Sequence, residues 1–300
     1  MFKNAIFYRI QTPLNLDPKI LQAKLDKYRV KPIGKTTPKN FGWCEPNPYV
    51  QDDLALACGD SIFIRLKINT RLLPQSVIND ELRERVAELE NKIQKKVAKK
   101  NRAELKDEII NELMPRAFVQ YSFVDAFINQ DSGLICVDAA SPSKAELLLS
   151  HLRVTLGSLP VVPLAAKVPV WQTLNYWIGI DKEMSSGLSM SGKYEVKTIQ
   201  GETEKVAKLS GFDSNGEVRD MVNAGGMAIS AGLEWRKNLS FTITDDFFIK
   251  SISDISEDDD GVIEKDEDPA HGYEANRFIV AAELTNMIVD LIMFFGEATR

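Results

Sequence analysis

The sequence predicts an α+β protein in which a central mixed α/β subdomain carries a projecting two-helix tip and precedes a C-terminal α+β subdomain. Three observations lead to this fold class. The chain has 300 residues, 44% of them hydrophobic, which suffices for a large core but is near the upper limit for a single one. Strand-like and helix-like segments alternate in both halves, separated by loops with Gly and Pro. Between residues 73 and 114, however, only helix-like periodicity occurs.

Residues 1–72 are expected to form the first part of the central subdomain. Ala5–Ile10 and Ser61–Ile68 are rich in β-branched and aromatic residues and are predicted as strands. Pro18–Arg29 has apolar residues at helical spacing and is predicted as a helix.

Residues 73–116 are predicted as the two-helix tip. One long helix is expected from Ser76 to about Lys100, because its apolar residues recur at spacings of three and four. These residues are Leu82, Val86, Leu89, Ile93 and Val97. Asn101, with Glu104 three residues later, is typical of a capping box and predicts the start of a second helix. That helix must end near Pro115.

Residues 117–168 are expected to complete the central subdomain. The segments "AFVQYSFVDAFI" and "LICVDA" flank the turn "NQDSG" and predict a β-hairpin. A helix should follow, with Ser141 as its N-cap, Pro142 at its first helical position and Gly157 at its end. The two prolines of "SLPVVPL" predict an extended connector.

Residues 169–300 are expected to form the C-terminal subdomain. The pattern restarts with a short helix, "WQTLNYWI", and continues with irregular strands. A hairpin is predicted in "LSFTITDDFFIKSI", followed by an acidic loop and a last helix.

Two segments approach known ligand-binding motifs without matching them. Gly187–Tyr194 resembles a phosphate-binding loop, but Tyr194 replaces the small hydroxyl residue and a strand-like segment follows, which favours a flexible loop. Ser256–Glu267 resembles a calcium loop, with Asp258 and Asp260 in place, but the first ligand and the flanking helices are missing. We therefore expect a solvated acidic loop and no metal site.

Catalysis and cofactor binding find no support in the sequence. His151 and His271 are the only histidines, and no nucleophile or carboxylate cluster accompanies them. Three widely spaced cysteines indicate buried reduced thiols. The N-terminus lacks a signal-peptide pattern, and Glu283 and Asp290 interrupt the most apolar segment. A cytosolic protein without catalytic activity or cofactor is expected.

Charge is unevenly distributed along the chain. The formal net charge is −6, yet residues 254–268 hold nine acids against Lys265, so the rest of the chain sums to +2. Seven bases against Glu104 give the segment 92–106 a charge of +6. These bases are Lys92, Lys95, Lys96, Lys99, Lys100, Arg102 and Lys106. A ridge of basic side chains like this one can follow the phosphate backbone of DNA without contacting the nucleobases. A solvated helix face is the alternative.

Three stretches of the chain carry a family resemblance. "LKDEIINELMPRAF", "GLICVDAASPSKAE" and "LRVTLGSLPVVPL" closely resemble the bacterial recombination-associated protein RdgC family, and the order of elements matches over essentially the whole chain. The resemblance implies a ring-shaped homodimer with a basic hole that binds DNA without sequence preference and restrains RecA-promoted strand exchange. It implies no enzymatic activity.

The resemblance also suggests roles for single residues. The "PRAF" element lies near a dimer contact in the family, which by position assigns Arg116 and Phe118 to that contact; a core position for Phe118 is the alternative. This chain departs from its relatives at "KLSG", where Lys208 alone persists as a candidate DNA contact, and at "GGMAIS". The positive lining of the C-terminal half is therefore in doubt.

Together with the basic segment, the resemblance implies a nucleoid-associated homodimer that encircles or clamps double-stranded DNA, with single-stranded DNA as a further ligand to consider, and that opposes RecA. Two rival functions remain open. The long helix could pair with a protein partner, its lysines being solvent-exposed only, or the cluster Asp258–Asp260 could serve a metal-dependent nuclease.

Overall fold

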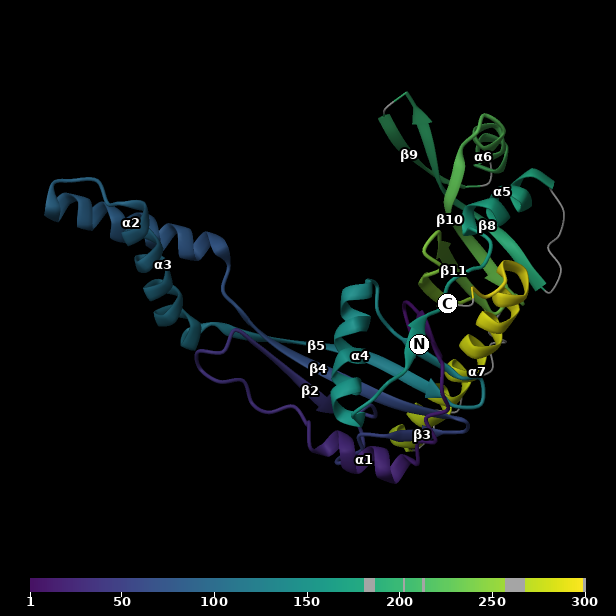
Figure 1. Cartoon of the computed structure of the whole chain (residues 1–300), viewed down its shortest axis with the longest axis horizontal. Helices are drawn as coiled ribbons and strands as arrows, with labels where there is room; N and C mark the ends of the chain where they lie inside the picture. The colour runs from purple at the N-terminus through teal and green to yellow at the C-terminus, as the bar shows by residue number, and fades with distance from the viewer. Residues whose placement is uncertain (181–186, 202, 212–213, 257–267, 299–300) are drawn as a thin grey trace. The chain divides into compact units, whose positions relative to one another are not determined.

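The computed structural model describes residues 1–180, 187–201, 203–211, 214–256 and 268–298. Helices and strands are mixed along this part of the chain, and the strands form two sheets, as the predicted fold class requires (Figure 1). The chain divides into two compact units. The larger unit consists of Met1–Lys27, Glu45–Arg65 and Val124–Arg300, and the smaller unit of Tyr28–Cys44 and Leu66–Phe123.

The first sheet has seven strands in the order β2-β4-β5-β6-β1-β7, with β3 paired to β4. The strands are β1 (Ile6–Ile10), β2 (Lys39–Cys44), β3 (Leu56–Cys58), β4 (Ser61–Leu72), β5 (Phe118–Asn129), β6 (Leu134–Val137) and β7 (Val161–Pro163). The predicted hairpin is confirmed, because β5 and β6 pair antiparallel from Ala126↔Val137 to Asn129↔Leu134. The predicted extended connector is also confirmed, since it supplies β7, which pairs with β1.

Two helices accompany this sheet, and their ends follow from local sequence. In α1 (Pro18–Asp26), the Asp17 carboxylate accepts hydrogen bonds from two backbone N–H groups of the first turn. In α4 (Pro142–Leu156), Ser141 is the N-cap residue and Gly157 ends the helix with a φ of 89°, a conformation that glycine adopts without strain. Both boundaries of α4 were predicted.

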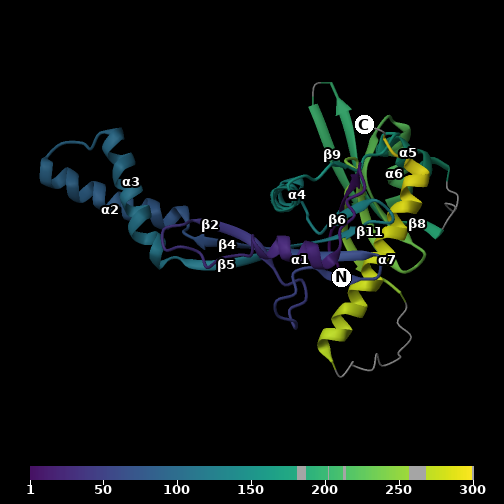
Figure 2. The same ribbon diagram turned by 60° about the horizontal axis from the view of Figure 1, so that its bottom comes forward.

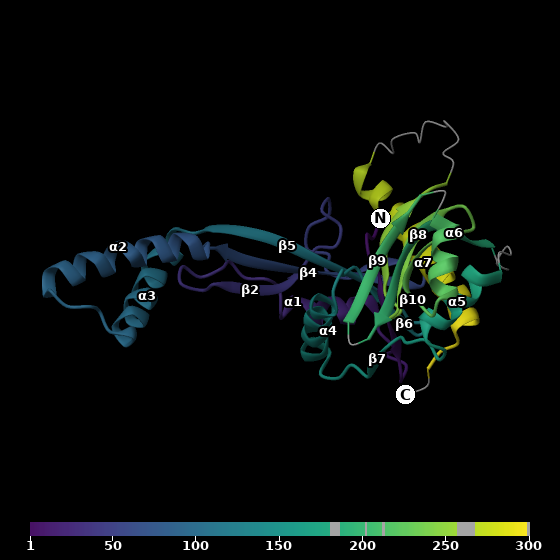
Figure 3. The same cartoon turned by 90° about the horizontal axis from the view of Figure 1, so that it is seen from above.

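The second sheet lies within the larger unit and has the order β12-β11-β10-β8-β9. Its strands are β8 (Leu188–Gln200), β9 (Thr203–Ser210), β10 (Met227–Trp235), β11 (Leu239–Thr244) and β12 (Ile249–Asp254). The helices α5 (Val170–Ile180), α6 (Ser214–Asn223) and α7 (Pro269–Phe295) lie beside it (Figure 3). The prediction of irregular strands is confirmed for β8 and β10, because the pairing of β10 with β8 shifts register along the strands. Helix α6 was not predicted. The flexible loop predicted at residues 187–194 is wrong, since β8 begins at Leu188.

Helix α7 is long and apolar enough to cross a membrane by length and composition. Within the larger unit, however, it buries Leu284, Ile288, Leu291 and other residues, and its acidic side chains bond to the second sheet and the turn that follows β10. Asp290 accepts a hydrogen bond from Trp235 Nε1 at 2.8 Å. We therefore describe α7 as a core helix.

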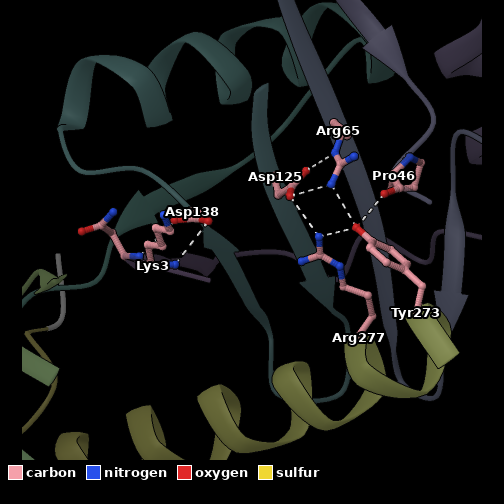
Figure 4. A network of polar contacts seen from close by, with 8 residues as sticks. Lys3, Pro46, Arg65, Asp125, Asp138, Tyr273 and Arg277 are labelled. Atoms are coloured by element: carbon pink, nitrogen blue, oxygen red, sulfur yellow. Dashed lines mark hydrogen bonds and ion pairs between the residues drawn. The ribbon is translucent and has the colours of Figure 1, made fainter. Parts of the chain in front are cut away.

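A partly buried charge cluster joins α7 to the first sheet inside the larger unit (Figure 4). Asp125 of β5 accepts hydrogen bonds from Arg65 of β4 at 2.5 and 2.9 Å and from Arg277 of α7 at 3.1 Å. The Tyr273 hydroxyl accepts from both arginines and donates to the carbonyl oxygen of Pro46 at 2.8 Å. One carboxylate thus neutralises two guanidinium groups in part, and the cluster keeps one net positive charge.

The three cysteines are buried and form no disulfide, as predicted from their spacing. Burial, followed by the charge of Glu274, raises the pKa of the Cys58 thiol to about 11. The thiolate is the reactive form, so this cysteine is held in its unreactive state at neutral pH.

Candidate nucleic-acid interface

The predicted tip is a helical hairpin made of α2 (Gln75–Ile93) and α3 (Lys99–Leu113), and it belongs to the smaller unit (Figure 2). One long helix to Lys100 was predicted, and this is wrong: α2 ends at Ile93, where Gln94 takes a left-handed conformation with a φ of 53°. The capping box predicted at Asn101 is also wrong. Ala98 occupies the N-cap position, three residues earlier, and no side chain caps the helix.

Glu90 is the physical reason for the break. Its Oε1 atom accepts a hydrogen bond from the backbone N–H of Val97 at 2.9 Å and another from Arg102 Nη2 at 3.1 Å. The carboxylate thereby ties α2 to the connection and to α3. Val97, the last member of the predicted stripe, is buried after the chain has turned back instead of continuing the helix. These two hydrogen bonds, that from Val97 first, lower the pKa of Glu90.

A second set of contacts joins the middle of α2 to the last turn of α3. Arg85 of α2 donates to both carboxylate oxygens of Glu112 on α3, at 3.2 and 2.6 Å, and to Glu81 at 2.8 Å. Ile109 of α3 is fully buried. A groove of about 490 Å³ runs along α2 from Asn79 to Glu90 and reaches Arg102.

The structure brings most of the predicted basic residues to the connection between α2 and α3. Lys92 lies in the last turn of α2, Lys95 and Lys96 lie in the connection, and Lys99 and Lys100 begin α3; all five are exposed. The break at Gln94 therefore divides the predicted ridge between the end of α2, the connection and α3.

The bases differ in whether an acid neutralises them. Arg102 forms an ion pair with Glu90, and Lys100 Nζ lies 4.0 Å from Glu104. Over the part of the chain that the structure describes, no ion pair involves Lys92, Lys95, Lys96, Lys99 or Lys106, although Lys106 is half-buried. Residues 73–114 contain nine bases and nine acids, so the positive charge at the connection results from position and not from composition.

Arg116 and Phe118 lie where α3 returns to the first sheet. A short 3₁₀ turn, Met114–Arg116, precedes β5, and Phe118, the first residue of β5, is 84% exposed. The alternative of a core position for Phe118 is therefore wrong for this chain. Arg71 of β4 braces this point, because its Nη1 atom donates to the carbonyl oxygen of Ala117 at 3.0 Å while its other nitrogens donate to that of Gly34.

Lys208 belongs to the larger unit, whereas the other candidates belong to the smaller unit. It pairs with Glu195 across β9 and β8, and the two side chains form an ion pair at 2.7 Å. Its charge is thus partly neutralised. The neighbouring departure from the family, "GGMAIS", covers Gly225, with a φ of 92°, and the first residues of β10.

Metal-ligating residues do not gather within the described ranges: no three His, Cys, Asp or Glu side chains there could hold one ion. The two histidines lie in α4 and α7. Asp258, Asp260 and the rest of the calcium-like segment up to Glu267 fall outside the described residues.

Comparison with known proteins decides the family. A family model described as "Putative exonuclease, RdgC" matches residues 1–298. The chain belongs to the RdgC family. A relative from Sodalis glossinidius, named "Recombination-associated protein RdgC", is 31% identical over 302 residues, which cover 100% of this chain and 98% of the relative. Relatives of the same name from Yersinia enterocolitica and Yersinia pestis are 31% and 30% identical over 299 residues, which cover 98% of this chain and 97% of each relative.

RdgC membership confirms the resemblance predicted from the sequence, over the full length of the chain. The relatives' names place the family in recombination, whereas the family model's description names a nuclease. Sequence analysis missed the exposed rings of Tyr121 and Phe123 on β5, because the strand pattern alone does not tell which face is covered.

Proposed function

We propose that this RdgC-family protein binds double-stranded DNA without sequence preference through the lysines at the α2–α3 connection. The observation that carries the proposal is the gathering of Lys92, Lys95, Lys96 and Lys99 there, exposed and outside the ion pairs of the described chain. Lysines bind phosphates as point charges and carry no sequence information. Such contacts position a protein on any duplex.

We further propose that the protein acts as a homodimer that closes into a ring or clamp around the duplex. Phe118 supports this proposal, because its aromatic ring is exposed next to Arg116 and follows a backbone segment that Arg71 holds in place. An exposed aromatic residue beside an arginine is typical of an interface anchor. A ring exposed to 84% provides apolar surface that a second subunit would cover.

The physiological role we propose is the modulation of RecA-dependent recombination in the cytoplasm, at the nucleoid, without catalysis. The relatives' names support the link to recombination. A nuclease is the competing function, since the family model's description names one. Incubation of the protein with duplex DNA and Mg²⁺ distinguishes the two, because only a nuclease produces fragments.

Gel shifts with three unrelated duplexes of equal length, across a salt series, test the main proposal. Equal affinities that fall steeply with salt are expected. A protein-interaction scaffold is the second candidate, favoured by the groove of about 490 Å³ along α2. Absence of any duplex binding at about 50 mM salt, where phosphate contacts are strong, would favour the scaffold and refute the proposal. Strand exchange by RecA, with and without the protein, then tests the proposed antagonism.

A further inference from the structure

The first half of β5 exposes three aromatic rings within six residues. Phe118, Tyr121 and Phe123 are 84%, 57% and 52% exposed. Tyr121 and Phe123 are two residues apart and therefore share one face of the strand, whereas Phe118 belongs to the opposite face. Substitutions of Tyr121 and Phe123 can therefore be tested separately from the proposed dimer contact at Phe118.

The strand-bearing part of the smaller unit is free of acidic residues. Residues 28–44, 66–74 and 115–123 contain seven bases and no Asp or Glu, in a protein whose net charge is −6. The bases are Arg29, Lys31, Lys35, Lys39, Lys67, Arg71 and Arg116. The net charge of these segments, +7, exceeds that of residues 73–114, where nine acids balance nine bases. A polyanion is the ligand that this charge favours.

Lys67 of β4 combines the two features. Its ammonium nitrogen lies 4.4 Å from the centre of the Tyr121 ring. A cation over an aromatic face is held weakly at an exposed site, at about 0.5 to 1 kcal/mol. A nucleobase can therefore take its place on the ring while the ammonium group moves to a phosphate of the same strand.

We propose that Lys67, Tyr121 and Phe123 form a binding site for single-stranded DNA. The two rings lie about 6.8 Å apart along the strand, twice the spacing of about 3.4 Å between stacked bases, so that each ring can receive a different base. Duplex DNA does not fit this chemistry, because its base faces are hidden in the stack. The site extends the proposed DNA binding to a second surface, and it can fail while duplex binding holds.

The test compares binding of a fluorescent oligo(dT) of about 20 nucleotides and of a duplex of the same length by anisotropy at one salt concentration. Removal of a stacking ring weakens single-strand binding by about fivefold to about 150-fold. The double variant Tyr121→Ala/Phe123→Ala should therefore lose at least about tenfold for oligo(dT) and less than about twofold for the duplex. Lys67→Ala should weaken the binding of oligo(dT) and leave the binding of the duplex unchanged.

Two controls separate stacking from other effects. Tyr121→Phe/Phe123→Tyr keeps both rings and should bind oligo(dT) like the wild type. Tyr176→Ala removes a ring of similar exposure, 63%, from the larger unit and should change neither affinity. Circular dichroism should show unchanged folding for all variants, since the replaced rings are mostly exposed.

Four results would overturn the inference. The double variant could bind oligo(dT) unchanged, or lose duplex binding equally, or change the mass of the protein in sedimentation, which would make the rings a subunit contact. The wild-type protein could also bind the duplex but no oligo(dT), in which case duplex binding stands without this site.

Discussion

Replacement of Lys92, Lys95 and Lys99 by alanine is the decisive perturbation for duplex binding. These three lysines flank or lie in the α2–α3 connection, are exposed, and form no ion pair within the described chain. Their removal leaves the Glu90 contacts that shape the turn intact. Exposed lysines of this kind stabilise a helix by about a few tenths of a kcal/mol each, so the fold should persist.

The expected change in the salt dependence of binding follows from the release of counterions from DNA. Each phosphate contact on duplex DNA contributes about 0.9 to the slope of log K against log salt, so three contacts contribute about 2.7. Between about 50 and about 200 mM salt, a fourfold change, the wild-type protein should therefore lose about 40-fold more affinity than the triple variant. The loss should be the same for every duplex sequence.

Fluorescence anisotropy at five or six salt concentrations measures both slopes directly. The matched control is Lys19→Ala/Lys27→Ala/Lys144→Ala, which removes the same charge from exposed lysines of the larger unit. This control should change the slope by less than about 0.9, the share of one contact.

Two results would refute the reasoning. An unchanged slope in the triple variant would show that the connection does not touch DNA. An equal change in the control would show that net charge alone, and not position, governs binding.

Three further predictions concern single residues. Phe118→Ala should shift the proposed dimer towards monomer in sedimentation at micromolar concentration and leave the far-ultraviolet circular dichroism spectrum unchanged, because the ring is 84% exposed in the single chain; a monomeric wild-type protein would contradict this. Asp125→Ala should lower the free energy of unfolding by about 3 to 5 kcal/mol in urea titration, because it leaves two largely buried guanidinium groups, those of Arg65 and Arg277, without their carboxylate; a loss below about 1 kcal/mol would contradict it. Glu90 has a lowered pKa in the folded chain, so its stabilisation is present above its unfolded pKa of about 4.3 and is lost as the pH falls through the folded value; the backbone amide it holds should shift in NMR spectra on acidification below about pH 4 in the wild type and not in Glu90→Gln.

Local signals predicted those parts of the fold that local interactions determine. Ser141 and Gly157 mark the ends of α4, and the turn "NQDSG" marks the β5–β6 hairpin, because capping and turn chemistry act within a few residues. The break at Gln94 was missed for the opposite reason. The apolar spacing continues to Val97, and only the contacts of Glu90 with residues seven and twelve positions later reveal the turn.

In the candidate site too, local sequence predicted some features, whereas others depend on contacts between distant residues. The clustering of Lys and Arg along the sequence located the basic segment 92–106, but the pairing of Arg102 with Glu90 and of Lys208 with Glu195 depends on tertiary contacts and strand register. The exposure of Phe118 could not be decided from its sequence, because an aromatic residue at a strand start is compatible with either a core or a surface position.

The position of the helical hairpin in the chain has a consequence for protein engineering and for evolution. β4 and β5 are neighbours in the first sheet, so residues 73–117 are topologically the connection of one β-hairpin, enlarged by two helices. Connections of this kind accept insertions and deletions at low entropic cost. A shortened protein with a tight turn in place of the helices should therefore still fold, and length variation among relatives should concentrate in this segment.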